Sequence, residues 1–209
     1  MRSFEYYTPT KVIFGKDTHL KIGEILKDYN CHKILIHYGG KSAVKSGLID
    51  DIKKCLTDVG FDFVTLGGVV PNPRLSKVRE GISLCRKENI DFILAVGGGS
   101  VIDSAKAIGY GVANPWTDVW NFFLKTEVPT ACIPIGAIPT IAASGSEMSG
   151  SCVITNEDGW LRPLSPEIYT DEPTSYLYIT GISDRKRLCG HSHAYNGTLF
   201  CQYRNHGDH

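Results

Sequence analysis

The chain has 209 residues, of which 42% are hydrophobic and 21% charged, and its 22 basic residues balance its 22 acidic ones. This composition is typical of a globular protein with one ordinary domain plus an extra segment. The zero net charge argues against nucleic acid or an anionic membrane surface as a partner. Seven cysteines without a C-x-x-C pair argue against a disulfide framework or a structural zinc site.

The N-terminal residues lack the apolar core of a signal peptide, and no apolar run is long enough to cross a bilayer. We therefore expect a cytoplasmic protein.

Apolar strand patterns alternate with helical ones along the first two thirds of the chain. Strands are predicted at 33–40, 61–69, 91–99 and 131–140, with 11–15 as an optional extra strand at the margin, and helices at 46–60, 74–89 and 100–113. This alternation predicts an α/β fold with a Rossmann-like, doubly wound and mostly parallel sheet. Ligands of such sheets bind at the edge where the strands end.

The pattern changes after about residue 160. The remaining sequence has no clear period of 2 or 3.6 and is rich in polar residues and turn formers. We expect a dinucleotide-binding domain over residues 1–160 and an irregular tail over 161–209. His191 and His193 are two residues apart, which suits no common metal site, so no metal ligand is predicted.

The most informative motif is AVGGGSVIDSAKAIG at 95–109. A strand runs into Gly97, Gly98 and Gly99, and a helix begins near Ser100, whose hydroxyl can cap it. Glycines let a backbone approach a phosphate, and a helix start offers unpaired N–H groups. The motif is neither G-x-G-x-x-G nor a Walker loop. It predicts either a phosphate site or merely a tight turn.

A second loop of this design follows the strand at 33–40. Gly39 and Gly40 precede Lys41, Ser42 and Lys45. The loop is either a turn with solvated lysines or a pocket for the adenosine ribose or its 2′-phosphate. An acidic residue here would favour NAD, so the two lysines slightly favour NADP.

A third polar loop, IPTIAASGSEMSG at 138–150, supplies hydroxyls from Thr140, Ser144, Ser146 and Ser149. On its own it is a loop of small residues, and it lacks the G-x-S-x-G pattern of a nucleophile elbow. The three loops are nevertheless predicted to share one sheet edge, as an extended dinucleotide requires.

Several of these segments together resemble the iron-containing alcohol dehydrogenase family, most closely its butanol dehydrogenase branch. The resemblance covers about residues 3–160 and is carried by YYTPTKVIFGKDT (6–18), VVPNP (69–73), AVGGGSVIDSAKAI (95–108), Pro139-Thr140, SGSEMSG (144–150) and ITNEDGW (154–160). It implies a Rossmann-like domain followed by an all-helical domain, with the cofactor between them.

The resemblance also implies which residues bind the cofactor. Gly98, Gly99 and Ser100 would hold the pyrophosphate. Asp103 would lie near the nicotinamide, although a carboxylate in a first helical turn is also explained by the helix dipole. The remaining cofactor-binding residues would be Thr140, Ser144 and Ser149 in the same cleft, and Gly39, Gly40, Ser42 and Asn72 on the adenosine side. Lys106 is interpreted as a surface or packing residue.

By this resemblance the function is NAD- or NADP-dependent interconversion of a small primary alcohol and its aldehyde. The family binds Fe2+ or Zn2+ with an aspartate and three histidines of the helical domain, and the metal polarises the substrate oxygen. Those ligands are missing here, so no catalytic or metal-binding residue is assigned and an inactive fragment is expected. A homodimer is a further expectation. The alternatives are a non-catalytic dinucleotide-binding fragment and a dehydroquinate-synthase-like lyase, against which the SGSEMSG loop argues.

The tail also suggests a shift of reading frame. Read one nucleotide later, its degenerate codons permit strings such as MHIMERYFVNTE, and residues 190–195 permit an aspartate four positions before a histidine. These strings resemble the start of the family's helical domain. The hypothesis is a frameshift near residues 161–166 that leaves an out-of-frame remnant; the alternative is a genuinely divergent tail.

Overall fold

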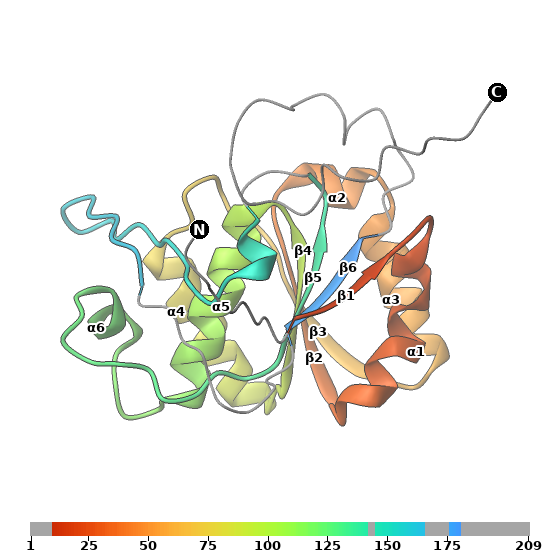
Figure 1. Ribbon diagram of the computed structural model, residues 1–209, viewed down its shortest axis with the longest axis horizontal. Coiled ribbons are helices and arrows are strands. Elements are labelled where there is room, and N and C mark those ends of the chain that lie inside the picture. The colour runs from red at the N-terminus through yellow and green to blue at the C-terminus, as the bar shows by residue number, and fades with distance from the viewer. Residues whose placement is uncertain (1–9, 142–144, 166–175, 181–209) are drawn as a thin grey trace, which may run out of the picture.

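A six-stranded, fully parallel sheet forms the centre of the computed structural model, which describes residues 10–141, 145–165 and 176–180 (Figure 1). The strand order is β1-β6-β5-β4-β2-β3. The strands are β1 (Lys11–Phe14), β2 (Lys33–Tyr38), β3 (Asp62–Leu66), β4 (Phe92–Gly97), β5 (Ile135–Pro139) and β6 (Tyr176–Thr180).

Helices cover both faces of the sheet (Figure 1). The α-helices are α1 (Ile22–Leu26), α2 (Lys41–Lys45), α3 (Leu48–Asp58), α4 (Leu75–Glu88), α5 (Gly99–Ala113) and α6 (Val119–Phe123). Short 3-10 turns lie at Thr18–Lys21, Lys27–Tyr29 and Ser146–Met148. The prediction of a doubly wound, mostly parallel α/β fold is confirmed. None of the helices within the described ranges is long and apolar enough to span a membrane.

Alternate residues of the central strands enter two separate cores. Leu35, Ile93 and Ala95 pack with the helices α4 and α5, whereas Ile34 and Leu94 pack with α1 and α3. A strand buried on both faces carries apolar residues at every position. This explains why the central strands have continuous apolar runs instead of alternating ones.

The direction of the winding reverses at β2, which pairs with β3 on one side and with β4 on the other. Tyr38 at the end of β2 lies opposite Val96 near the end of β4. The loops that follow these two strands are therefore neighbours at one edge of the sheet. Such a switch point is where open α/β sheets bind ligands.

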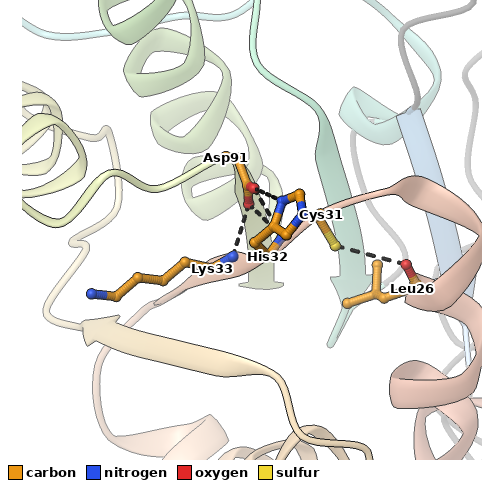
Figure 2. A network of polar contacts seen from close by, with 5 residues as sticks. All are labelled: Leu26, Cys31, His32, Lys33 and Asp91. Atoms are coloured by element: carbon orange, nitrogen blue, oxygen red, sulfur yellow. Dashed lines mark hydrogen bonds and ion pairs between the residues drawn. The ribbon is translucent and has the colours of Figure 1, made fainter.

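The opposite edge is held by a polar network around Asp91 (Figure 2). Its carboxylate accepts hydrogen bonds from the backbone amides of His32 at 2.8 Å and Lys33 at 2.9 Å, and lies 2.9 Å from His32 Nδ1. The Asp91 amide donates to the Lys33 carbonyl at 3.1 Å. The thiol of Cys31 donates to the carbonyl of Leu26 at 3.7 Å. The bonds of Asp91 fasten the starts of β2 and β4 to each other.

The expectation of an irregular tail is wrong for β6. This strand lies inside the sheet, between β1 and β5, and pairs in parallel with both. Its sequence YLYIT consists of aromatic, β-branched and leucine residues that suit a strand, but the turn formers around it hid the pattern. The helices α1, α2 and α6 were also not predicted. Residues 166–175 and 181–209 lie outside the described ranges, so the domain boundary and the reading frame remain predictions.

Candidate functional site at the carboxyl edge of the sheet

The turn from β4 into α5 presents a helix N-terminus at the switch point. Gly98 is the N-cap, with extended backbone, and its carbonyl accepts from the amides of Val101 at 2.9 Å and Ile102 at 3.2 Å. The amides of Gly99 and Ser100 belong to the first turn, where a helix offers no internal acceptor. With the partial positive charge of a 15-residue helix, they form a site suited to an anion.

Close packing explains the glycines of this turn. A Cβ on Gly97 would lie 2.5 Å from Cγ2 of Val101, and one on Gly98 would lie 3.1 Å from Cγ2 of Ile141. The amide of Thr140 donates to the carbonyl of Gly97 at 3.1 Å, which joins the ends of β5 and β4. The first and third polar loops therefore meet at one edge of the sheet, as predicted, and a hydrogen bond joins them directly.

A second feature is an open pocket of about 370 Å³ at the end of β2. It is lined by Tyr38, Gly39, Gly40, Val44, Lys45 and Gly68. The ring of Tyr38 lies against Gly67, where a Cβ would come within 2.5 Å of it. The amide of Gly68 donates to the carbonyl of Gly39 at 3.1 Å and fixes the loop to the end of β3. The predicted Gly39 and Gly40 are thus pocket residues, whereas the side chains of Lys41 and Ser42 lie outside the described part.

Asn72 occupies the segment between β3 and α4 in left-handed backbone, with φ of 57°. Asparagine tolerates this conformation better than most residues. The adjacent Pro73 carbonyl accepts from the amide of Thr155 at 2.8 Å, and the Leu75 amide donates to the Thr155 carbonyl at 2.9 Å. The Asn72 turn is therefore held by the segment that follows the third loop.

A small antiparallel hairpin extends this segment, with bridges from Val153 to Leu164 and from Asn156 to Leu161. Its Glu157 accepts from the hydroxyl of Ser76 and, at 3.3 Å, from the Ser76 amide, so it caps the start of α4. Sequence analysis missed this cap because the two residues are 81 positions apart.

The third loop contains a 3-10 turn that begins after Gly145, whose φ is 68°. Ser146 is buried, and the hydroxyl of Ser149 lies 3.3 Å from that of Ser151. Thr140 is half-buried at the end of β5. The predicted Ser144 lies outside the described residues.

Asp103 and Lys106 of α5 hold the third loop. Asp103 Oδ1 accepts from the Ser146 hydroxyl at 2.5 Å, and its Oδ2 accepts from the Val153 amide at 3.1 Å. Lys106 is fully buried, and its Nζ donates to the Ser146 carbonyl at 2.5 Å, the Ser146 hydroxyl at 3.0 Å and the Ser151 carbonyl at 2.8 Å. The sequence-based interpretation of Lys106 as a packing residue missed these hydrogen bonds, for which only the D-x-x-K spacing on a helix was a signal.

The described residues fit a dinucleotide better than they fit a metal ion. The close packing of the glycine turn leaves no room for a Cβ on Gly97, and the first-turn amides of α5 suit an anion. Within the described ranges, no group of three or more histidine, cysteine, aspartate or glutamate residues could hold a metal. His191 and His193 lie outside those ranges.

Comparison with known proteins agrees with this geometry. A family model for iron-containing alcohol dehydrogenase matches residues 9–172. The probable NADH-dependent butanol dehydrogenase 1 of Bacillus subtilis is 44% identical over 78% of this chain and 43% of its own length. The NADPH-dependent aldehyde reductase of Escherichia coli is 35% identical over 75% of this chain and 40% of its own length.

Among solved structures, the NADH-dependent butanol dehydrogenase A of Thermotoga maritima superimposes with a TM-score of 0.79 at 38% identity, over 86% of this chain and 44% of that one. The chain thus spans less than half the length of these relatives. The family match covers most of the sequence and the whole edge where the polar loops meet, and on this ground the chain belongs to the iron-containing alcohol dehydrogenase family.

Proposed function

We propose that this chain binds NAD(P) along the carboxyl edge of its sheet, as the nucleotide domain of an enzyme that interconverts a small primary alcohol and its aldehyde. The observation that carries the proposal is the meeting of three polar loops at the switch point, with the N-terminus of α5 between them. The names of the relatives, which refer to butanol and aldehydes, support an alcohol dehydrogenase over a dehydroquinate-synthase-like lyase.

Each loop has a defined role in this proposal. The amides of Gly99 and Ser100 bind the pyrophosphate, and the Ser100 hydroxyl adds one more donor. The pocket beside Gly39 and Gly40 receives the adenosine ribose, with Asn72 in the neighbouring turn. Thr140, Ser144 and Ser149 line the nicotinamide side. The nicotinamide carries the hydride chemistry, and these residues bind and orient it.

The choice between the two dinucleotides follows from Lys45, the charged residue that lines the pocket. An ammonium group favours the 2′-phosphate of NADPH, whereas NAD sites usually place a carboxylate near the ribose hydroxyls. The Bacillus and Thermotoga relatives are named for NADH and the Escherichia relative for NADPH. We propose a preference for NADPH. A tighter Kd for NADPH than for NADH, abolished by Lys45→Ala, would support it, and an unchanged ratio would contradict it.

The binding proposal is tested by fluorescence titration of this chain with NADPH. Ser100→Ala removes one hydrogen bond of about 1 kcal/mol, so we expect about a fivefold weaker Kd. Gly99→Val places a branched side chain where the phosphate must approach, so binding should be lost. Ser83→Ala on the exposed side of α4 is the matched control. Unchanged binding by Gly99→Val would show that this turn holds no phosphate.

We further propose that the 209-residue chain does not turn over butanol, even with added Fe2+ or Zn2+. The resemblance places the metal ligands on a helical domain. Since β6 lies in the sheet, we propose that residues 181–209 are the out-of-frame remnant of that domain, after a frameshift near residues 161–166. The nucleotide sequence over codons 155–170 tests the frame directly. Metal-dependent NAD(P)H turnover by this chain would contradict the proposal, as would an uninterrupted family reading frame in that stretch.

A further inference from the structure

Three side chains of one α5 face contact a single segment, residues 146–153, which includes the end of the third loop. Asp103, Lys106 and Tyr110 follow one another at helical spacing, so they project from the same side of the helix. Asp103 accepts from the Val153 amide, and the Tyr110 hydroxyl donates to the Gly150 carbonyl. With the bonds of Lys106, these contacts hold residues 146–153 at both ends and near the middle. We call these three residues the α5 clasp.

Lys106 contributes most of the polar contacts of the clasp. It is 0% exposed, and three donors of its ammonium match three acceptors of the loop, two of which are backbone carbonyls. A buried lysine without acceptors would be strongly unfavourable. A methionine would fill the same volume, so packing alone does not require an ammonium group here.

The charge of Lys106 is balanced through the loop itself. The Ser146 hydroxyl accepts from Lys106 and donates to Asp103, which links the two charged groups by one hydroxyl. Burial lowers the pKa of Lys106, and the carboxylates of Asp103 and Glu147 oppose this effect. Each of the two α5 residues therefore needs the loop in its present position to satisfy its own charge.

The clasp also connects the loop to the phosphate-binding end of the same helix. Lys106 lies about two turns after Gly99. At the other end of the loop, the Thr140 amide is bonded to Gly97. Ser149 lies between the clasped carbonyls of Ser146 and Gly150. The segment 146–151, fixed at these points, moves with α5 and does not need to be ordered when a ligand arrives.

We propose that Lys106 is a positioning residue, which holds residues 146–151 as a preformed wall of the dinucleotide site. It acts on the cofactor through Ser149 and the loop backbone without touching it. The inference rests on the proposed dinucleotide binding. A wall ordered in advance lowers the ordering cost of binding, so its loss weakens affinity even when the domain stays folded.

The test compares Lys106→Met and Tyr110→Phe with the wild-type chain, with Lys87→Met on the exposed side of α4 as control. Three quantities are measured: the NADPH Kd, hydrogen exchange of residues 146–153, and the urea midpoint. We expect Lys106→Met to raise the Kd about tenfold and to speed exchange in this segment selectively, since local opening needs no global unfolding. Tyr110→Phe changes no charge and little volume. It should also raise the Kd and speed exchange in this segment, by a smaller factor.

The variants separate positioning from other causes. If Lys106→Met changed the Kd and Tyr110→Phe did not, the change would come from the lost charge of Lys106, and the proposal would be overturned. A lower urea midpoint with unchanged Kd would leave Lys106 a purely structural role and also overturn it. If Lys106→Met does not fold, Tyr110→Phe decides alone. If the wild-type chain binds neither dinucleotide, the proposed function fails, and the exchange data still show whether the clasp orders the loop.

Discussion

His37 makes the stability of this domain depend on pH, because its imidazole is buried and neutral. The ring lies in β2 with 0% exposure. Its Nδ1 lies 2.9 Å from the Leu66 carbonyl and its Nε2 lies 2.9 Å from the Ser104 hydroxyl. Since a carbonyl only accepts, Nδ1 carries the proton and Nε2 accepts from Ser104. The neutral ring is fully hydrogen-bonded, and a second proton would make Nε2 a donor facing that hydroxyl.

The size of the effect follows from the pKa of this ring. Burial, with a smaller contribution from the charge of Lys77, lowers the pKa of His37 from 6.5 to about 4, although the hydrogen bond to Leu66 and the charge of Glu80 act in the opposite direction. Below pH 6.5 the unfolded chain takes up a proton that the folded domain refuses until about pH 4. At about 1.4 kcal/mol per pH unit, the free energy of unfolding falls by about 3 kcal/mol across this window. The contribution of the neutral His37 ring to the free energy of unfolding is fully present above pH 6.5 and is lost below about pH 4.

The assay is urea unfolding followed by circular dichroism at several pH values from 7.5 to 4. We compare the wild-type chain with His37→Gln, which cannot titrate but can still donate to the Leu66 carbonyl. Carboxylates titrate in both proteins, so the difference between the two curves isolates His37. His19→Gln is the control, since that residue is half-buried in the Thr18–Lys21 turn and is not part of the Asp91 network.

The expected result is a free energy of unfolding that falls less steeply with acid in His37→Gln, by about 3 kcal/mol over the whole window. At pH 7.5 the same variant should be the less stable protein, because glutamine fills the site poorly. Parallel curves for the two proteins would refute the argument, because they would mean that the buried ring is charged in the folded state or that the site admits water.

Three further substitutions test particular contacts. Asp91→Ala leaves the amides of His32 and Lys33 without their acceptor and should lower the free energy of unfolding by about 2 kcal/mol, whereas Asp62→Ala at the exposed start of β3 should have little effect in the same urea experiment. Glu157→Ala removes the cap of α4 and should cost about 1 kcal/mol in thermal unfolding, with the exposed Asp158→Ala as its control. Leu177→Pro interrupts the strand between β1 and β5 and should cost about 3 kcal/mol in urea unfolding; an unchanged midpoint would mean that β6 adds no stability.

The sequence predicted the central sheet because its signals are local. Continuous apolar runs ending in glycine mark β2 and β4, and the helical spacing of apolar residues marks α3 and α4. The two strands at one margin of the sheet, β1 and β6, were harder to predict. β1 was predicted only as an optional strand, and β6 was missed, because a short segment such as YLYIT becomes a strand only through its pairing with β5. The short helices α1, α2 and α6 have five residues each, too few for a periodic pattern.

For the candidate site, the sequence predicted where the loops lie but not which residues form hydrogen bonds with one another. The glycine turn and the pocket residues lie at one edge as expected, because parallel strands with right-handed crossovers leave no other arrangement. The hydrogen bonds of Asp103, Lys106 and Glu157 join residues 40 to 81 positions apart. The periodic pattern of apolar residues in the sequence does not predict such pairs. The D-x-x-K spacing indicated a shared helix face, but only the fold shows that this face meets the third loop.

The helix α5 is held on three sides, and this bears on how its N-terminus would bind the phosphate of the proposed dinucleotide. Ser104 fastens it to β2 through His37, while the clasp fastens it to the third loop. Toward α4 it packs so closely that a Cβ on Gly111 would lie 2.2 Å from Cδ1 of Ile82. Amides bind an anion well only when they already point at it, because turning them on binding would cost much of the affinity. A helix held by polar contacts on two sides and by close packing on a third cannot tilt. In the proposed dinucleotide site, the buried polar residues of α5 therefore support the N-terminal turn of the helix even though they lie one to three helical turns away from it.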